Sequence, residues 1–289
     1  MKGGPLLGVA LNLAALLLFV VMDTFVKLLT AEFAVPQIMW ARFLFGFLLV
    51  VVAVRLSAGH LPWRSRAPGL QTLRSLLLAA CNLMFSTALA HLPLTDATAI
   101  GFASPLLTVA LAALWLHEPV TPRRWLGVGL GMAGVLIALR PPFLTGETMH
   151  WAALLPLGTA ACYAVYSILT RRLATIDDSR TTILHTGFAA SIVTTLVQPF
   201  VWTAPSTGEW GVLVLLGVLG GAGHGLLVLA YARAPVAVLA PLSYTQLVWT
   251  TLIGILVFAD WPDGWTLLGA AIIAAGGLLV AVPGRRTGA

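Results

Sequence analysis

The sequence predicts an all-α integral membrane protein with ten transmembrane helices, arranged as two inverted repeats of five helices. Composition is the first observation: of 289 residues, 59% are hydrophobic and 9% are charged. A water-soluble domain carries about 25% charged residues, so this chain has too little polar surface to be one. The second observation is a series of ten apolar segments, each near the about 20 residues that cross about 30 Å of hydrocarbon. The third is an internal repeat.

The repeat relates residues 88–141 to residues 230–283 by a shift of 142 positions without a gap. The shift places Pro93 on Pro235, Glu118 on Asp260, Gly127 on Gly269 and Gly134 on Gly276. Matches of proline, acid and glycine in one register indicate a true repeat, which sets the architecture. We therefore expect halves at residues 1–141 and 142–289. Because five is an odd number of spans, the second half has to cross the membrane in the opposite sense.

The expected spans follow the apolar runs between turn-forming residues. In chain order they lie near residues 6–28, 36–56, 71–91, 96–116, 124–140, 150–171, 181–202, 210–232, 236–258 and 264–282. Prolines occupy most connections: Pro36, Pro62, Pro68, Pro93, Pro119, Pro122, Pro141, Pro142, Pro205, Pro235, Pro262 and Pro283. The first apolar run is too long for a signal peptide and lacks a cleavage site, so we expect it to be retained.

Positive charges predict the orientation. If the N-terminus is cytoplasmic, thirteen of the sixteen Lys and Arg residues fall on the cytoplasmic side. Positive residues favour that side, so we expect both termini in the cytoplasm of a cell with a bacterial-type inner membrane. The basic residues are dispersed over short loops, which argues against a nucleic-acid partner. The partner that we expect around the helices is the lipid bilayer. Cys81 and Cys162 lie inside spans without a CxxC neighbour, so we expect no metal and no cofactor.

Residues 88–139 resemble a known repeat. Pro105, the acidic turn at Glu118 and the series Gly127, Gly131 and Gly134 are similar to the EamA repeat of the drug/metabolite transporter superfamily. The stretch PQIMWAR at residues 36–42 resembles the start of that family's second helix. The resemblance implies ten helices in two inverted repeats, a central cavity lined by helices 1–4 and 6–9, and peripheral helices 5 and 10. It also implies export of amino acids, other metabolites or drugs, with aromatic amino-acid exporters the most similar in length.

Polar and aromatic stripes inside the spans predict the solute contacts, because a polar group facing lipid is costly and usually turns inward. The residues expected to line the cavity are Asn12, Trp40, Asn82, Phe85, Thr98, Phe102, Tyr163, Tyr166, Ser167, His224, Ser243, Tyr244 and Gln246. The alternative is that such residues only join neighbouring helices, at about 1 kcal/mol per hydrogen bond. For the aromatic residues it is simple packing.

Charged residues near the outer ends of the first two spans predict a gate. Asp23, Lys27 and Arg42 have the charges for an outer ion pair, although snorkelling to the interface also explains them. Pro105, Gly220 and Gly221 are the expected hinges, with close helix packing as the alternative reason for the glycines. No carboxylate lies near the middle of a span, which favours a facilitator or exchanger over a proton antiporter.

The positions of the charged residues narrow the class of solute. Phosphorylated solutes need cations deep in the cavity, whereas Arg42 and Arg74 lie near span ends. We therefore expect a neutral or zwitterionic amphipathic solute, most of all an amino acid, exported by alternating access, with drugs or other metabolites as the alternative. A membrane-embedded enzyme is a further alternative, although the chain has no P-loop lysine, H-E-x-x-H or G-x-S-x-G motif. We expect a monomer or a weak dimer.

Overall fold

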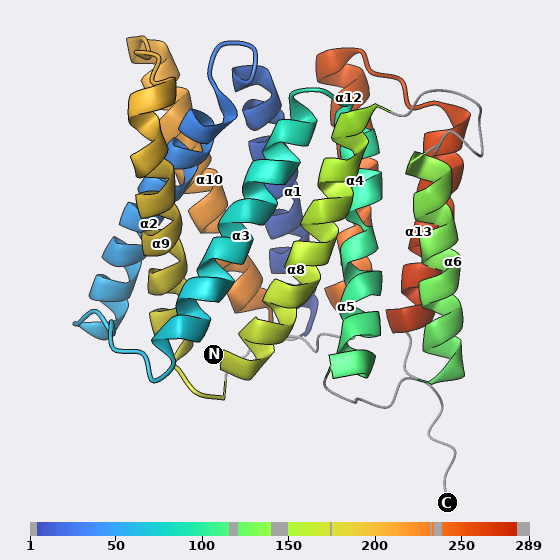
Figure 1. The fold of residues 1–289 in the computed structure, drawn as a ribbon, viewed down its shortest axis with the longest axis horizontal. Helices are drawn as coiled ribbons and strands as arrows, with labels where there is room; N and C mark the ends of the chain where they lie inside the picture. The colour runs from blue at the N-terminus through green and yellow to red at the C-terminus, as the bar shows by residue number, and fades with distance from the viewer. Residues whose placement is uncertain are drawn as a thin grey trace, which may run out of the picture.

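The computed structural model describes residues 5–115, 121–139, 150–173, 175–231, 233 and 239–281, and these residues form helices without any strand (Figure 1). The first half contains α1 (Pro5–Leu29), α2 (Val35–Ala58), α3 (Pro68–Leu89), α4 (Leu94–Gly101), α5 (Ala103–Trp115) and α6 (Pro122–Leu139). The second half contains the 3-10 turn η1 (Trp151–Ala153), α8 (Leu154–Leu173), α9 (Ser179–Val201), α10 (Thr207–Tyr231), the 3-10 turn η2 (Ala240–Tyr244), α12 (Thr245–Phe258) and α13 (Gly264–Ala281).

Length and hydropathy fit a membrane protein. Seven helical segments of the described chain are long and apolar enough to cross a bilayer, and three apolar helices are shorter, at residues 125–138, 242–258 and 264–279. Large apolar side chains cover the outside: Phe200 is 85% exposed and Leu256 is 80% exposed. Water would make such a surface aggregate, whereas lipid solvates it. The all-helical membrane fold is therefore confirmed, and the number of ten spans stays a prediction.

The fourth expected span, residues 96–116, is interrupted. α4 ends at Gly101 and α5 begins at Ala103, with Phe102 between them. Pro105 accounts for the break, because a proline has no N–H to give to the carbonyl four residues earlier and its ring clashes with that carbonyl, here the one of Gly101. The repeat shift places Phe102 on Tyr244, where η2 gives way to α12. The rings of Phe102 and Tyr244 lie against each other, with 5.2 Å between their centroids.

The two halves run in opposite directions (Figure 1). α1 begins at the lower side, and α8 begins at the upper side. α5 ends and α6 begins at the lower side, whereas α12 ends and α13 begins at the upper side. The main contacts join one half to the other: α1 packs on α10, α3 on α8, α2 on α9 and on α10, and α3 also on α9. Any interior site is therefore built by helices from both halves.

α6 and α13 form a separate pair at one end of the molecule (Figure 1). Their glycines let the two backbones touch: a Cβ added to Gly134 would lie 2.8 Å from the Gly269 carbonyl oxygen. A Cβ on Gly276 would lie 2.6 Å from the Gly127 carbonyl oxygen. Small residues at this spacing are how membrane helices pack when no hydrophobic force drives them together. The pair contacts α4 and α5 and leaves the polar interior to the other helices.

Candidate functional site

A buried arginine lies where α3, α8 and α9 meet. Arg74, near the start of α3, is only 5% exposed. Its Nε donates to Thr170 Oγ1 (2.6 Å), its Nη1 to Thr186 Oγ1 (2.5 Å) and its Nη2 to the Tyr166 hydroxyl (2.6 Å). Its guanidinium carbon also lies 4.4 Å from the centre of the Tyr166 ring. No carboxylate of the described chain lies within 4.0 Å of it.

Three more titratable groups of the interior come from α1, α2 and α10. Arg42 on α2 and Arg74 both lie within electrostatic reach of the His224 ring on α10. Arg42 also acts on Asp23 of α1, although the two form no ion pair within 4.0 Å in the part of the chain that the structure describes. The His224 side chain is exposed although it lies well inside a long helix, and its ring is 5.0 Å from Phe19. These groups come from both halves and define a polar interior.

The expected tyrosines belong to this polar interior. Tyr163 is 42% exposed, and its ring centroid lies 5.2 Å from that of Tyr166, one helical turn further along α8. Ser167 follows on the same helix and donates to the Tyr163 carbonyl oxygen. The structure thus brings Tyr163, Tyr166 and His224 together with Arg42 and Arg74.

Three other residues expected to line the cavity make hydrogen bonds within the protein. Asn12 is 2% exposed and donates to the Leu239 carbonyl oxygen, and Thr98 donates to the Leu94 carbonyl oxygen of its own helix. Asn82 is half-buried and also donates to its own helix, to the Leu78 carbonyl oxygen. Such bonds are the alternative role of polar groups in membrane helices, and solute binding by these three residues stays a prediction.

The expected aromatic contacts are distributed over two clusters. Trp40 donates to Thr195 Oγ1 and packs edge-on against Trp202 and Trp210, between α2, α9 and α10. Phe85 lies beside Gly101 at the break between α4 and α5. Phe102 and Tyr244 pack on each other, and Ser243 and Gln246 flank Tyr244 in the chain. The role of each in solute binding stays a prediction.

Lys27 has a different partner from the one expected. Its Nζ lies 2.9 Å from Asp260 Oδ2, in the α12–α13 connection, and also donates to the Leu92 carbonyl oxygen (3.2 Å). The Phe258 ring centre lies 4.5 Å away. Because Lys27 occupies the last turn of α1, its long side chain reaches past the helix end, and Asp23 lies one turn further inside. We call the Lys27–Asp260 ion pair the upper latch, since it joins α1 to the second half.

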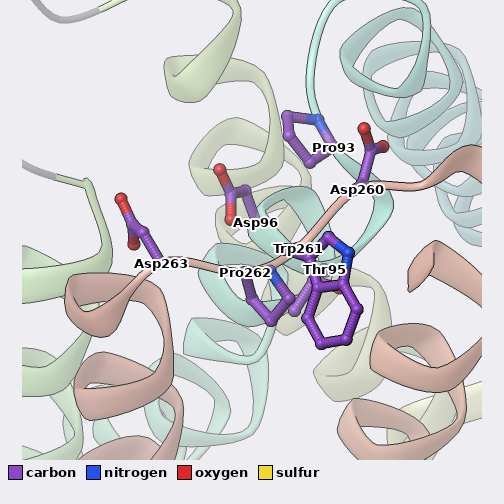
Figure 2. A pocket seen from close by; sticks show the side chains of 7 residues that line it. All are labelled: Pro93, Thr95, Asp96, Asp260, Trp261, Pro262 and Asp263. Atoms are coloured by element: carbon purple, nitrogen blue, oxygen red, sulfur yellow. The ribbon is translucent and has the colours of Figure 1, made fainter.

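A hollow of about 180 Å³ lies next to the upper latch (Figure 2). Figure 2 shows the start of α4 facing the α12–α13 connection; the lining residues are Pro93, Thr95, Asp96, Asp260, Trp261, Pro262 and Asp263. The walls are also tied together, because Thr266 of α13 donates from its hydroxyl to Asp96 Oδ1 (2.8 Å) and from its N–H to Asp263 Oδ1 (2.8 Å). At the upper side, contacts therefore join α1 and α4 of the first half to α13 and the α12–α13 connection of the second.

The expected hinge glycines lie in an unbroken helix. α10 is continuous through Gly220 and Gly221, and both face other helices. A Cβ on Gly220 would lie 3.3 Å from Met22 Sδ of α1, and one on Gly221 would lie 2.8 Å from Leu49 Cδ2 of α2. Both positions therefore face close side chains of neighbouring helices, and bending at these positions stays a prediction.

Known proteins with the same two-repeat organisation are similar to this chain. The EamA-like transporter family matches residues 6–140 and again residues 150–282. The riboflavin transporter of Vibrio cholerae is 28% identical over 94% of this chain and 92% of its own length. The S-adenosylmethionine uptake transporter of Rickettsia bellii is 26% identical over 82% of this chain and 80% of its own length. The pseudopaline exporter of Pseudomonas aeruginosa is 28% identical over 92% of this chain and 93% of its own length.

A solved crystal structure shares the fold. It superposes with a TM-score of 0.66 at 21% identity, over 94% of this chain and 95% of the other.

Proposed function

Because the chain belongs to the EamA-like transporter family, we propose that it moves its solute by alternating access through the polar interior between its halves. Its family and relatives make it a multi-pass membrane transporter of small metabolites and not an enzyme. We propose that ten spans in two inverted repeats, residues 1–141 and 142–289, form the carrier in a bacterial inner membrane. Both termini lie in the cytoplasm in this proposal.

The observation that carries the proposal is a polar interior built by helices of both halves, with an ion pair between the halves at the upper side. The upper latch joins α1 to the α12–α13 connection, and the polar interior is built from α1, α2, α3, α8 and α10. Carriers built from inverted repeats place the solute at the repeat interface and open it to one side at a time. In such a mechanism, contacts between the halves that break and re-form set the balance between the two states, and we assign the upper latch this role.

The solute and the direction of transport are proposals. The relatives are named for riboflavin, S-adenosylmethionine and pseudopaline, two for transport or uptake and one for export, and none for amino-acid export. The tyrosine rings of the interior, next to its charged groups, favour a small amphipathic solute. We propose export of neutral amino acids, the aromatic ones first, with other metabolites or drugs as the second candidates.

Flux into proteoliposomes tests the carrier. Purified full-length protein is reconstituted, and uptake of radiolabelled amino acids, riboflavin and a lipophilic drug is measured with and without a pH gradient. Saturable uptake of any of these solutes, with counterflow when the lumen is preloaded, is the expected result. Flux that rises linearly with concentration, with no counterflow for any of them, would contradict alternating access and indicate a channel.

Breaking the upper latch tests the mechanism. Lys27→Gln and Asp260→Asn each remove a partly exposed ion pair worth about 1 kcal/mol, which shifts the balance between the two states about fivefold. We expect a several-fold change in the saturable uptake rate and a partial return to wild type in the exchanged variant Lys27→Asp with Asp260→Lys. Arg55→Gln, an exposed cation at the end of α2, is the control without effect. Unchanged rates in both single variants would contradict a gating role.

A further inference from the structure

Arg74 is held by acceptors that leave its charge uncompensated. Its three partners, Tyr166, Thr170 and Thr186, are neutral hydroxyls. The hydroxyls of Thr170 and Thr186 also donate to their own helices, to the carbonyl oxygens of Tyr166 (2.7 Å) and Thr182 (2.7 Å). Each therefore presents its oxygen to Arg74 in a fixed orientation. Lys27, by contrast, is neutralised by Asp260.

A buried cation without a counter-ion is expensive, and in a membrane protein it marks a site of function. The other interior charges do not supply the missing anion, because Asp23 faces the charge of Arg42. Together Asp23, Arg42 and Arg74 leave one positive charge in excess. The polar interior therefore favours a solute that brings an anionic group.

The remaining donors of Arg74 match a carboxylate. A guanidinium has five N–H groups, and three of those on Arg74 are taken: the single one on Nε, one on Nη1 and one on Nη2. The two that remain lie on different nitrogens, one on Nη1 and one on Nη2. A donor on Nη1 and one on Nη2 can together bind the two oxygens of a carboxylate, which a lysine in the same place would not do.

We propose that Arg74 binds the carboxylate of the transported solute, whose planar or aromatic body lies against Tyr163. Tyr163 supplies that surface, because it is 42% exposed and lies next to Tyr166, which stacks under the guanidinium. This inference rests on the proposed function and assigns its solute class: carboxylates with an apolar body, including zwitterions, and not organic cations. From the sequence, Arg74 enters only as a cation near a span end that does not favour a phosphorylated solute.

Ligand pairs that differ only at the carboxylate test the assignment on the wild-type protein. Melting of the purified full-length protein is followed with phenylalanine, phenylalaninamide, phenethylamine and potassium chloride, each over a concentration series. We expect saturable stabilisation by phenylalanine and none by the amide or the amine. Equal stabilisation by the amide, or by chloride alone, would overturn the carboxylate assignment.

Transport by variants separates this inference from the carrier itself. In proteoliposomes, Arg74→Lys and Arg74→Gln are expected to raise the KM for phenylalanine at least about tenfold, as loss of charge-assisted hydrogen bonds does. Arg172→Gln, an exposed cation at the end of α8, is the matched control. Size-exclusion profiles check that the variants fold. Saturable phenylalanine uptake with unchanged KM in folded Arg74→Gln would reject Arg74 and keep the carrier, whereas absence of saturable flux of any solute in the wild type would reject the carrier.

Discussion

Asp177 lies in the α8–α9 connection and is hydrogen-bonded to the α2–α3 connection and the start of α3, at the lower side of the molecule. Its carboxylate accepts hydrogen bonds from Ser65 Oγ, from the Arg66 N–H (2.9 Å) and from Gln71 Nε2 (2.8 Å). Desolvation alone would raise the pKa of Asp177, but these three hydrogen bonds and the charge of His185 outweigh it and lower the pKa below the ordinary 3.8. The charged form of Asp177 is therefore the one that the fold stabilises.

The lowered pKa predicts a stability that depends on pH. Charged Asp177 stabilises the fold at every pH above its unfolded pKa, and this contribution is lost as the pH falls through the lower folded pKa. We expect Asp177→Asn to melt below the wild type at pH 7, and the gap between the two melting temperatures to shrink as the pH falls below about 4. Intrinsic fluorescence of the detergent-solubilised proteins measures both curves. A gap that does not change with pH would mean that the charge plays no part.

Single residues also show where the sequence stops being informative. Helical spacing predicts Tyr163 and Tyr166 on one face of their helix, and in the structure their rings lie 5.2 Å apart beside Arg74. For Arg74, the sequence gives only its position near the end of a span. Its importance comes from its partners, which lie at residues 166, 170 and 186, on helices of the other half. No local pattern in the chain encodes those neighbours.

At the scale of elements, the pair formed by α6 and α13 depends on glycines that face each other. A Cβ on Gly276 would lie 2.6 Å from both the Gly127 carbonyl oxygen and the Gly131 nitrogen. Both are backbone atoms, which cannot rotate away as a side chain would. The helices would have to separate, and every contact along their interface would lengthen.

We therefore expect Gly276→Ala to destabilise the protein by about 1–3 kcal/mol, as overpacking of a close interface does. The matched control is Gly129→Ala on α6, where an added Cβ meets no atom within 4 Å. Thermal unfolding in the same detergent measures both variants. Equal melting temperatures for Gly276→Ala and Gly129→Ala would contradict the close packing of α6 on α13.

The interruption of the fourth span is determined by the local sequence. Pro105 removes a hydrogen bond to Gly101, and α4 ends there. The ninth expected span, residues 236–258, begins differently: η2 covers Ala240–Tyr244, and residues 234–238 lie outside the described chain. Proline explains a break in its own helix, whereas the contact between Phe102 and Tyr244 requires both halves to be in place.

For the whole molecule, composition and the repeat predict the most. The membrane fold and the EamA resemblance are confirmed. Both were predictable because apolar content and a repeated register are properties of the entire chain and do not depend on any single position. The pairing of helices follows from the opposite directions of the halves: α1 lies on α10 and α3 on α8, pairs that the repeat makes equivalent. Side-chain partners across these interfaces are the part that sequence alone does not provide.

The opposite directions predict which loops face which compartment. In a background with Cys81→Ala and Cys162→Ala, single cysteines are placed at two exposed positions, Arg123→Cys at the start of α6 and Trp261→Cys in the α12–α13 connection. With both termini in the cytoplasm, a membrane-impermeant maleimide added to intact cells should label Trp261→Cys at once and Arg123→Cys only after permeabilisation. The reverse pattern would mean that both termini lie outside the cytoplasm, while the two halves would still be inverted. Labelling of both cysteines from the same side would contradict the inversion, and with it the proposal that the two halves alternate around a shared solute.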